Sequence, residues 1–358
     1  MAKIKVCIVS VSLGKGGLER SCANLSLLLS DYGYNVHLVI LNDDVDYEYK
    51  GQLFNLGIHK TDEDTLWTRL ARFTKLRRYF RQQKFDYIID NRIGHQPWRE
   101  LYYMLYIYGL RAKVVYVQHS SKLENHLPDK SFILKQIVRY AYAFIGVSKG
   151  ISAKFNAYTS SSKCQTIYNY KNEILPIEED YSYLDNYILF LGRLDDATKN
   201  ITLLLESFSL ISDDIASQLI IMGDGPDKAL IEMRIADLKL QDRVVLKPFE
   251  PHVYLALSKA RCVILTSRHE GFPMVLVEAL SVGTPLIAVD CESGPSEIVQ
   301  NEINGLLVEN YNPEALAQSV YRMYTDQELY DNCKKMSKDS IAFLDKEVIV
   351  KQWLALLK

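Results

Sequence analysis

The sequence contains none of the features that mark an exported, membrane-spanning or nucleic-acid-coating protein. Its six cysteines form no CxxC pair and show no paired spacing, which indicates reduced thiols in a cytosol. No stretch reaches the roughly 18 uninterrupted apolar residues of a membrane span, and residues 1–14 enter a strand-like segment without a signal-type apolar run. A net charge of −2 at pH 7 gives the whole chain little attraction for nucleic acid. We therefore expect a cytoplasmic protein with no membrane span and no nucleic-acid partner.

The chain is long enough for two domains, because 358 residues exceed the size of one ordinary domain and 48% of them are apolar. Short β-rich runs alternate with helical stretches, and several runs are apolar at consecutive positions, as expected of strands covered on both faces. This alternation predicts an α/β fold of two doubly wound, Rossmann-like domains with parallel sheets and a cleft between them. The predicted strands are residues 5–11, 35–41, 85–90, 113–119, 144–148, 187–192, 218–223, 243–249, 262–267, 285–290 and 305–310.

Composition also indicates where one domain ends and the next begins. Residues 171–186 are acidic, contain a proline and lack a helical stripe, so we expect them to link the domains. The first domain would then be residues 1–170 and the second residues 187–342. Residues 343–358 carry an amphipathic helical pattern, and we expect this C-terminal helix to pack back towards the first domain.

Candidate ligand-binding residues follow predicted strands, where open parallel sheets bind their ligands. Residues 14–20 (GKGGLER) place glycines before a helix, so that the backbone can approach an anion at the helix start. A dinucleotide fingerprint would need a glycine in place of Glu19 and an acid in place of Asn42, which closes the second strand. The motif disfavours a Rossmann dehydrogenase and leaves two possibilities, an anion-binding turn or a tight turn without a ligand.

A second signal follows the first strand of the second half. Residues 191–200 (LGRLDDATKN) place Arg193 at the strand end and Lys199 at the start of the next helix. Two cations on one such loop can share a phosphate or a diphosphate. The alternative is that both are ordinary solvated surface charges.

The strongest signal is residues 267–280 (SRHEGFPMVLVEAL). Pro273 suits the first turn of a helix, and the N–H groups that follow it can bind an anion. Glu270 precedes this helix start and Glu278 lies within the helix, so the two acids bracket an anion site and can bind the neutral ends of a ligand with a charged centre. The alternative is one acid that supports the helix dipole and one surface acid.

Taken together, these segments resemble the retaining glycosyltransferases of family four, the glycosyl transferases group 1, which have the GT-B fold. The resemblance covers nearly the whole chain, and its most specific element is the E-x7-E motif formed by Glu270 and Glu278. A segment at 166–172 resembles the hinge of the family, with Tyr170 in place of the usual glycine. The other matching segments are GGLER at 16–20, QHS at 118–120, GVSKG at 146–150, GRLDDATKN at 192–200 and MGDGP at 222–226.

The resemblance implies that the second domain holds most of a nucleotide-sugar donor. Arg193 and Lys199 would clamp its diphosphate, Glu278 would bind the ribose, and Glu270 would bind the sugar. From the first domain, two glycines would close on the phosphates, and His119 would reach the donor sugar. The implied catalytic residues are His119, Arg193, Lys199 and Glu270. The implied donor-binding residues are Gly16, Gly17, Arg193, Lys199, Gly223, Gly225, Gly271, Phe272, Pro273, Met274, Val275 and Glu278.

The function implied by this resemblance is a hexosyltransferase that retains the anomeric configuration. It would move a hexose or N-acetylhexosamine from a nucleotide sugar, carried by UDP, to a glycan acceptor in bacterial polysaccharide or lipopolysaccharide synthesis. No cofactor or metal is expected, because fixed cations and a helix start stabilise the leaving diphosphate. The DxD sequence from Asp44 to Asp46, which could bind a metal, is interpreted as solvated surface far from the other motifs. The alternatives are an epimerase or phosphorylase of the same fold, or a non-catalytic nucleotide-sugar-binding partner.

Residues 67–84 carry seven cations and no acid, with apolar residues near a helical stripe. Such a helix suits an anionic membrane surface, which would make the protein peripheral on the inner face of the cell membrane and the acceptor lipid-linked. The alternative is that the stripe faces the core and the charges are solvated. The tyrosine-rich segment 98–110 could line an acceptor groove or simply pack a helix.

Overall fold

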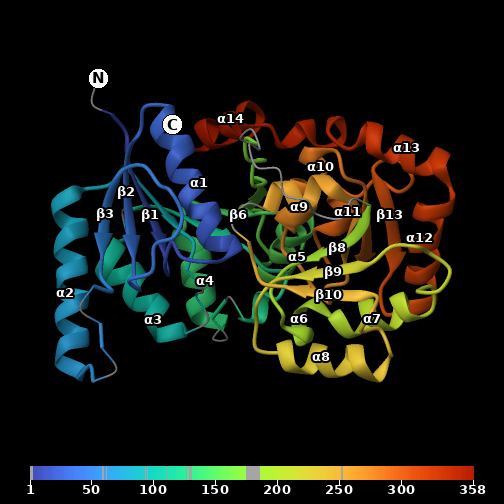
Figure 1. Cartoon of the computed structure of the whole chain (residues 1–358). Helices are drawn as coiled ribbons and strands as arrows, with labels where there is room; N and C mark the ends of the chain where they lie inside the picture. The colour runs from blue at the N-terminus through green and yellow to red at the C-terminus, as the bar shows by residue number, and fades with distance from the viewer. Residues whose placement is uncertain are drawn as a thin grey trace. The chain divides into compact units, whose positions relative to one another are not determined.

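The computed structural model describes residues 3–58, 60–61, 63–92, 94, 96–110, 112–125, 127–128, 131–174, 186–250 and 253–358. The chain divides into two compact units (Figure 1). Unit 1 comprises Met1–Asn169 and Glu347–Lys358, and unit 2 comprises Tyr170–Lys346. Within the predicted linker, residues 175–185 lie outside the described residues.

Unit 1 is built on a parallel sheet with the strand order β3-β2-β1-β4-β5-β6-β7. Most positions in the central strands are buried, which explains why these strands are apolar at consecutive residues rather than alternately. The order reverses between β1 and β4, so the loops after these strands flank a topological switch point. The strands are β1 (Lys5–Ser10), β2 (Asn35–Ile40), β3 (Gln52–Asn55), β4 (Tyr87–Asp90), β5 (Lys113–Gln118), β6 (Ala143–Gly146) and β7 (Cys164–Thr166).

Helices cover both faces of this sheet (Figure 1). Apolar side chains of α2 and of the π-helical segment η1 form one core cluster with the strands, and those of α4 and α5 contribute to a second. The helices are α1 (Gly17–Asp31), α2 (Leu66–Gln83), α3 (Pro97–Tyr102), η1 (Tyr103–Tyr108), the short η2 (Leu123–Asn125), α4 (Ser131–Tyr140), α5 (Lys149–Thr159) and the C-terminal α14 (Lys346–Leu356).

The end of the chain is held in unit 1 by three tyrosine hydroxyls. Tyr34 donates to the carbonyl of Leu357 at 3.0 Å, Tyr142 donates to that of Leu356 at 3.3 Å, and Tyr87 donates to that of Lys358. The last carbonyls of a helix accept no hydrogen bond from within the helix, so these hydroxyls serve as their donors. One face of α14, including Trp353, is buried. The C-terminal helix is therefore part of unit 1 from Glu347 onward.

Unit 2 has a parallel sheet with the strand order β10-β9-β8-β11-β12-β13, and its order reverses between β8 and β11. The two sheets confirm the predicted fold of two doubly wound α/β domains. The strands are β8 (Tyr187–Leu191), β9 (Leu219–Met222), β10 (Val244–Lys247), β11 (Ala260–Leu265), β12 (Leu286–Asp290) and β13 (Gly305–Glu309). The helices are α6 (Asp196–Lys199), α7 (Ile201–Ser209), α8 (Lys228–Asp237), α9 (Val253–Lys259), α10 (Met274–Val282), α11 (Pro295–Ile298), α12 (Pro313–Thr325), α13 (Gln327–Met336) and η3 (Asp339–Leu344).

Candidate active site

The switch point of unit 2 brings together the two motifs that the sequence placed after β8 and β11. The backbone N–H of Arg268 donates to the carbonyl of Thr198 at 2.9 Å, and the hydroxyl of Thr266 donates to the carbonyl of Lys199 at 2.9 Å. These bonds tie the loop after β11 to the short helix α6. Arg193 is exposed, and its side chain has no hydrogen-bond or ion-pair partner among the residues that the structure describes, whereas its carbonyl accepts from the backbone N–H of Asp195 at 2.9 Å.

Lys199 and Glu270 form an ion pair at the centre of this site. The Nζ atom of Lys199 lies 2.6 Å from Oε1 of Glu270, and the Ser267 hydroxyl donates to the same oxygen at 2.7 Å. The side chains are 22% and 13% exposed, so the pair is partly desolvated and still accessible. The sequence assigned these residues to the diphosphate and to the sugar separately, and it gave no sign of their direct contact or of Ser267.

The predicted glycines after β9 have a packing role. A Cβ atom on Gly223, whose φ is +156°, would lie 1.8 Å from the carbonyl oxygen of Gly192. A Cβ atom on Gly225 would lie 2.2 Å from the carbonyl oxygen of Leu194. Both glycines therefore let the loop after β9 lie directly against the loop that carries Arg193.

Helix α10 begins one residue later than the sequence predicted. Pro273 is the N-cap residue rather than part of the first turn, because its ψ of 96° is extended, and the helix starts at Met274. The first N–H groups of a helix have no acceptor within the helix, so Met274 and Val275 present theirs at the switch point. The first turn contains no acid that would compete with an anion, and Glu278 lies buried one turn further along.

The loop after β12 supports the segment between Glu270 and the helix. The Ser293 hydroxyl donates to the carbonyls of Glu270 at 3.1 Å and Gly271 at 3.2 Å. Gly294 has a φ of +96°, and a Cβ atom there would lie 2.6 Å from Cδ of Pro273. Phe272, whose backbone is also among the predicted donor-binding groups, is buried. This loop could not be predicted from the sequence, because no spacing rule connects it to the E-x7-E motif.

The glycine loop of unit 1 lies beside two carboxylates. A Cβ atom on Gly16 would meet the Glu19 carboxylate at 2.1 Å, whereas one on Gly17 would meet nothing within 4 Å. Burial raises the pKa of Glu19, and the neighbouring charge of Asp44 adds to this effect. Of the two glycines assigned to the donor phosphates, Gly17 is therefore the one with open space.

The prediction that the DxD sequence lies far from the other motifs was wrong. The backbone N–H of Leu13 donates to the carbonyl of Asp44 at 2.9 Å, and that of Asp46 donates to the carbonyl of Leu13 at 3.0 Å. The cause is topological: β1 and β2 are neighbours, so the loops that follow them run side by side. Asp44 and Asp46 are nevertheless exposed, as expected of solvated surface.

His119 lies directly after β5 and contacts Asn91, which was not among the predicted site residues. Its Nε2 atom is 2.9 Å from Oδ1 of Asn91, which follows the neighbouring strand β4. Parallel strands end at the same edge of a sheet, so both residues belong to the edge where ligands bind. A polar residue directly after β4 was the signal that could have pointed to Asn91.

The basic segment of residues 67–84 divides into a part whose apolar side chains are buried and a part whose apolar side chains are exposed. Leu76 and Phe80 are buried in the core, so the stripe faces inward over the C-terminal half of α2. At the start of α2, Trp67 is 80% exposed and Leu70 is 54% exposed. Within the described residues, no helix is both long and apolar enough to cross a membrane.

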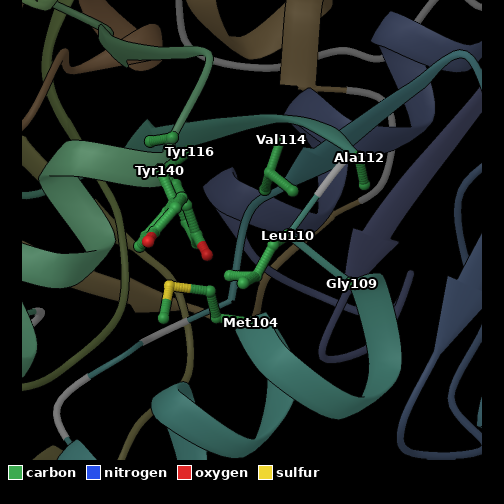
Figure 2. Close-up of a pocket in the computed structure, with 8 residues that line it drawn as sticks. Met104, Gly109, Leu110, Ala112, Val114, Tyr116 and Tyr140 are labelled. Carbon is green, nitrogen blue, oxygen red and sulfur yellow. The ribbon is translucent and has the colours of Figure 1, made fainter.

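The tyrosine-rich segment mainly packs the fold. Tyr103, Met104 and Tyr108 belong to η1 and are buried. Figure 2 shows the side chains that line a small hollow, among them Met104, Leu110, Val114, Tyr116 and Tyr140. Val114 lies near the amino end of β5, so this hollow is at the opposite end of the strand from His119.

Two family models match the chain and together cover both units. The model described as Glycosyltransferase Family 4 matches residues 15–170, and the model described as Glycosyl transferases group 1 matches residues 181–340. The chain belongs to the family 4, group 1 glycosyltransferases. These matches confirm the predicted family and the predicted class of enzyme, a glycosyltransferase.

Known glycosyltransferases resemble this one over their full length. It is 28% identical to the N-acetylgalactosamine-N,N'-diacetylbacillosaminyl-diphospho-undecaprenol 4-alpha-N-acetylgalactosaminyltransferase of Campylobacter jejuni, with 99% of each chain covered. It is 23% identical to the amylovoran biosynthesis glycosyltransferase AmsD of Erwinia amylovora, again over 99% of each chain. A crystal structure of a TarM variant from S. aureus matches with a TM-score of 0.77, at 15% identity and with 100% of each chain covered, which is a likeness of fold. The two named relatives are bacterial enzymes of lipid-linked glycan and polysaccharide synthesis.

Proposed function

We propose that this glycosyltransferase moves a hexose or N-acetylhexosamine from a UDP-sugar to a lipid-linked glycan, in the synthesis of a bacterial surface polysaccharide or lipopolysaccharide. The observation that carries the proposal is the Lys199–Glu270 pair beside the start of α10, at the switch point of unit 2. The C. jejuni relative, named for an acceptor linked to diphospho-undecaprenol, supports a lipid-linked acceptor, and the TarM structure, a complex that contains UDP, supports the nucleotide.

The ion pair of unit 2 suggests how the donor is received. Phosphate oxygens compete with a carboxylate for an ammonium group, so a donor diphosphate draws Lys199 away from Glu270. Glu270 then accepts hydrogen bonds from the sugar hydroxyls while Ser267 continues to orient it. Arg193 and the N–H groups at the start of α10 bind the remaining phosphate oxygens, and Glu278 binds the ribose.

The transfer step separates charge, and these groups stabilise it. The bond between the anomeric carbon and the diphosphate oxygen breaks, which leaves negative charge on UDP and positive charge on the sugar ring. Fixed cations and backbone N–H groups stabilise the leaving UDP without a divalent metal. The acceptor oxygen attacks from the same face, and its proton passes to the departing phosphate, which retains the anomeric configuration. We assign His119 of unit 1 to this step.

The chemistry is tested by a screen of nucleotide sugars for thermal stabilisation, followed by turnover with the hits in the presence of a chelator. We expect a UDP-sugar to stabilise the protein, turnover to resist the chelator, and NMR of the product to show the retained anomer. An inverted anomer, or loss of turnover with the chelator, would contradict the mechanism. A donor that stabilises the protein without any transfer or hydrolysis would favour a binding protein instead of an enzyme.

The site assignment is tested by three variants. Glu278→Ala should weaken UDP binding, and Lys199→Ala should mainly lower kcat, by about 10²-fold or more, because it removes a cation that acts on the developing charge. Arg234→Ala is the matched control, because it removes a cation from a half-exposed ion pair with Glu206 elsewhere in unit 2. Equal kinetics for Lys199→Ala and Arg234→Ala would refute the assignment of Lys199 to the donor site.

A membrane surface is the second partner that we propose, and exposed aromatic residues support it. Trp67, Trp98 and Phe132 are the second residues of α2, α3 and α4, and they are 80%, 65% and 67% exposed. These helices follow β3, β4 and β5 along the chain, so they begin towards the carboxyl edge of the parallel sheet, and the three residues lie in their first turns. Aromatic side chains in such positions suit a membrane interface.

Charge supports the same surface. The segments 66–83, 97–108 and 131–140 contain nine cations and one acid, Glu100, which is buried against Arg92. Cations near an anionic leaflet contribute about 1 kcal/mol each. We therefore propose peripheral binding to the inner face of the cell membrane through the starts of these helices, which would also bring a lipid-linked acceptor to unit 1.

Tryptophan emission provides the test of membrane binding. Vesicles that contain phosphatidylglycerol should shift the emission of the protein to shorter wavelength, and vesicles of phosphatidylcholine alone should not. The double change Trp67→Ser and Trp98→Ser should reduce co-flotation with the anionic vesicles. Tyr311→Ser, which removes an aromatic side chain that is 61% exposed in unit 2, is the control. Equal flotation of all three proteins would end the proposal.

A further inference from the structure

His119 and Asn91 meet at the carboxyl edge of the sheet of unit 1. They follow β5 and β4, which are paired parallel strands with Asp90 opposite Tyr116. The Nε2 atom of His119 lies 2.9 Å from Oδ1 of Asn91. This contact determines which ring nitrogen holds the proton, because an amide oxygen can only accept a hydrogen bond.

The orientation of Asn91 is fixed by its other bonds. Its backbone N–H donates to the carbonyl of Val9 on β1 at 2.9 Å, and its side-chain nitrogen Nδ2 donates to the carbonyl of Ile89 at 3.5 Å. Only 2% of Asn91 is exposed. Because the amide nitrogen faces a carbonyl, the amide oxygen must face the histidine, and the ring must donate from Nε2.

A buried charge network immobilises both neighbours of Asn91. The Arg92 guanidinium bonds to Asp90 at 2.7 and 3.0 Å and to Glu100 at 3.0 Å, and it lies 3.5 Å from the centre of the Tyr103 ring. Tyr108 donates to Oδ2 of Asp90 at 2.8 Å, which is also the oxygen that Arg92 bonds at 2.7 Å. These groups are almost fully buried, so the chain on either side of Asn91 is held in one conformation.

We propose that Asn91 is a positioning residue that holds neutral His119 as the tautomer with its proton on Nε2. Nδ1 then carries no proton, so this nitrogen can only accept a hydrogen bond and does not donate a proton to the leaving phosphate. This inference rests on the proposed role of His119 in the transfer.

The tautomer can be read directly from the two-bond ¹H–¹⁵N NMR spectrum of the protein without a substrate, at about pH 8, above the usual histidine pKa. The His119→Gln variant identifies the signals of the ring. We expect an unprotonated Nδ1 and a protonated Nε2 in the wild type. Asn91→Leu, which has a similar size and no acceptor, should shift the ring towards a mixture of tautomers, and Asn91→Asp should keep the proton on Nε2. A proton on Nδ1 in the wild type, or a spectrum unchanged by Asn91→Leu, would overturn the proposal.

Kinetics separate this inference from the proposed function. Asn91→Leu should lower kcat by about 10- to 100-fold, the range for loss of a group that orients a functional histidine, with little change in the donor KM. The double variant with His119→Gln should be no slower than His119→Gln alone, because both changes act through one ring. Additive losses in folded proteins would overturn the proposal. Full activity of His119→Gln would instead refute the role of His119 in the transfer, while the NMR result would still stand.

Discussion

The two units use the same kind of ion pair for different purposes, and burial distinguishes them. In unit 2, the side chains of Lys199 and Glu270 are 22% and 13% exposed. In unit 1, the side chains of Arg92 and Asp90 are 2% and 1% exposed. An accessible pair can exchange partners with a charged ligand, whereas a buried pair cannot separate without leaving a desolvated charge. The pair in unit 2 is therefore suited to a reaction, and the pair in unit 1 is suited to fixing the backbone that presents Asn91.

The largest difference between the units should appear when each cation is removed. Arg92→Met leaves Asp90 and Glu100 buried without their partner, and we expect the free energy of unfolding of unit 1 to fall by about 3–5 kcal/mol. Lys199→Met should cost about 1 kcal/mol or less in unit 2, because water can reach the remaining carboxylate. Urea denaturation measures the first value, and hydrogen exchange of unit 2 peptides measures the second.

Tryptophan fluorescence isolates unit 1 in this experiment, since all three tryptophans of the chain belong to that unit. Trp353 is 5% exposed and reports unfolding, whereas the other two are exposed in the folded state. Lys199→Met should leave this transition unchanged and still lose activity. Equal costs for the two substitutions would show that burial does not distinguish the pairs.

A smaller contrast is expected between two of the predicted glycines. Gly223→Ala would force a methyl group against the carbonyl of Gly192, so we expect a loss of about 1–3 kcal/mol in the stability of unit 2. Gly17→Ala meets open space at the start of α1 and should change the stability of unit 1 by less than about 1 kcal/mol. The measurements are the exchange and fluorescence assays described above.

Kinetic measurements test the Gly17→Ala variant in a second way. If donor phosphates approach Gly17, its methyl group should raise the donor KM although the fold is intact. An unchanged KM would restrict donor binding to unit 2. A Gly223→Ala protein as stable as the wild type would show that the loops after β8 and β9 can separate.

Features that lie within short segments of the chain could be predicted from the sequence, whereas contacts between distant residues could not. Alternating strands and helices, the E-x7-E motif and the family order predicted two α/β domains, and the comparisons confirm this fold and family. These signals lie within short segments of the chain. The ion pair of Lys199 with Glu270 and the contact of His119 with Asn91 join residues 71 and 28 positions apart, so no local pattern contains them. The position of Asp44 beside the glycine loop was missed for the same reason.

The smallest effect that we predict concerns the reach of the Glu270 charge. Burial, and then the charge of Glu270, raises the pKa of Cys291 to about 12. Glu270→Gln removes this charge, so the pKa of Cys291 should fall, and its thiolate fraction should rise at alkaline pH. We expect faster alkylation of Cys291 by iodoacetamide, measured by mass spectrometry of its peptide. Cys262 is the internal control, because its pKa of about 12 arises from burial without a contribution from Glu270.

Lys199→Met distinguishes this electrostatic effect from a loosened loop. Removing the cation leaves Glu270 with its full charge, which should hold the pKa of Cys291 at least as high and slow its alkylation. A loop that merely opens would speed the reaction in both variants. Opposite changes in the alkylation rate of Cys291 in the two variants, with an unchanged rate for Cys262, would therefore show that the charge of the Glu270 carboxylate acts on the Cys291 thiol. Parallel changes would show that the ion pair holds the loop closed, which would make Lys199 a structural cation like Arg92.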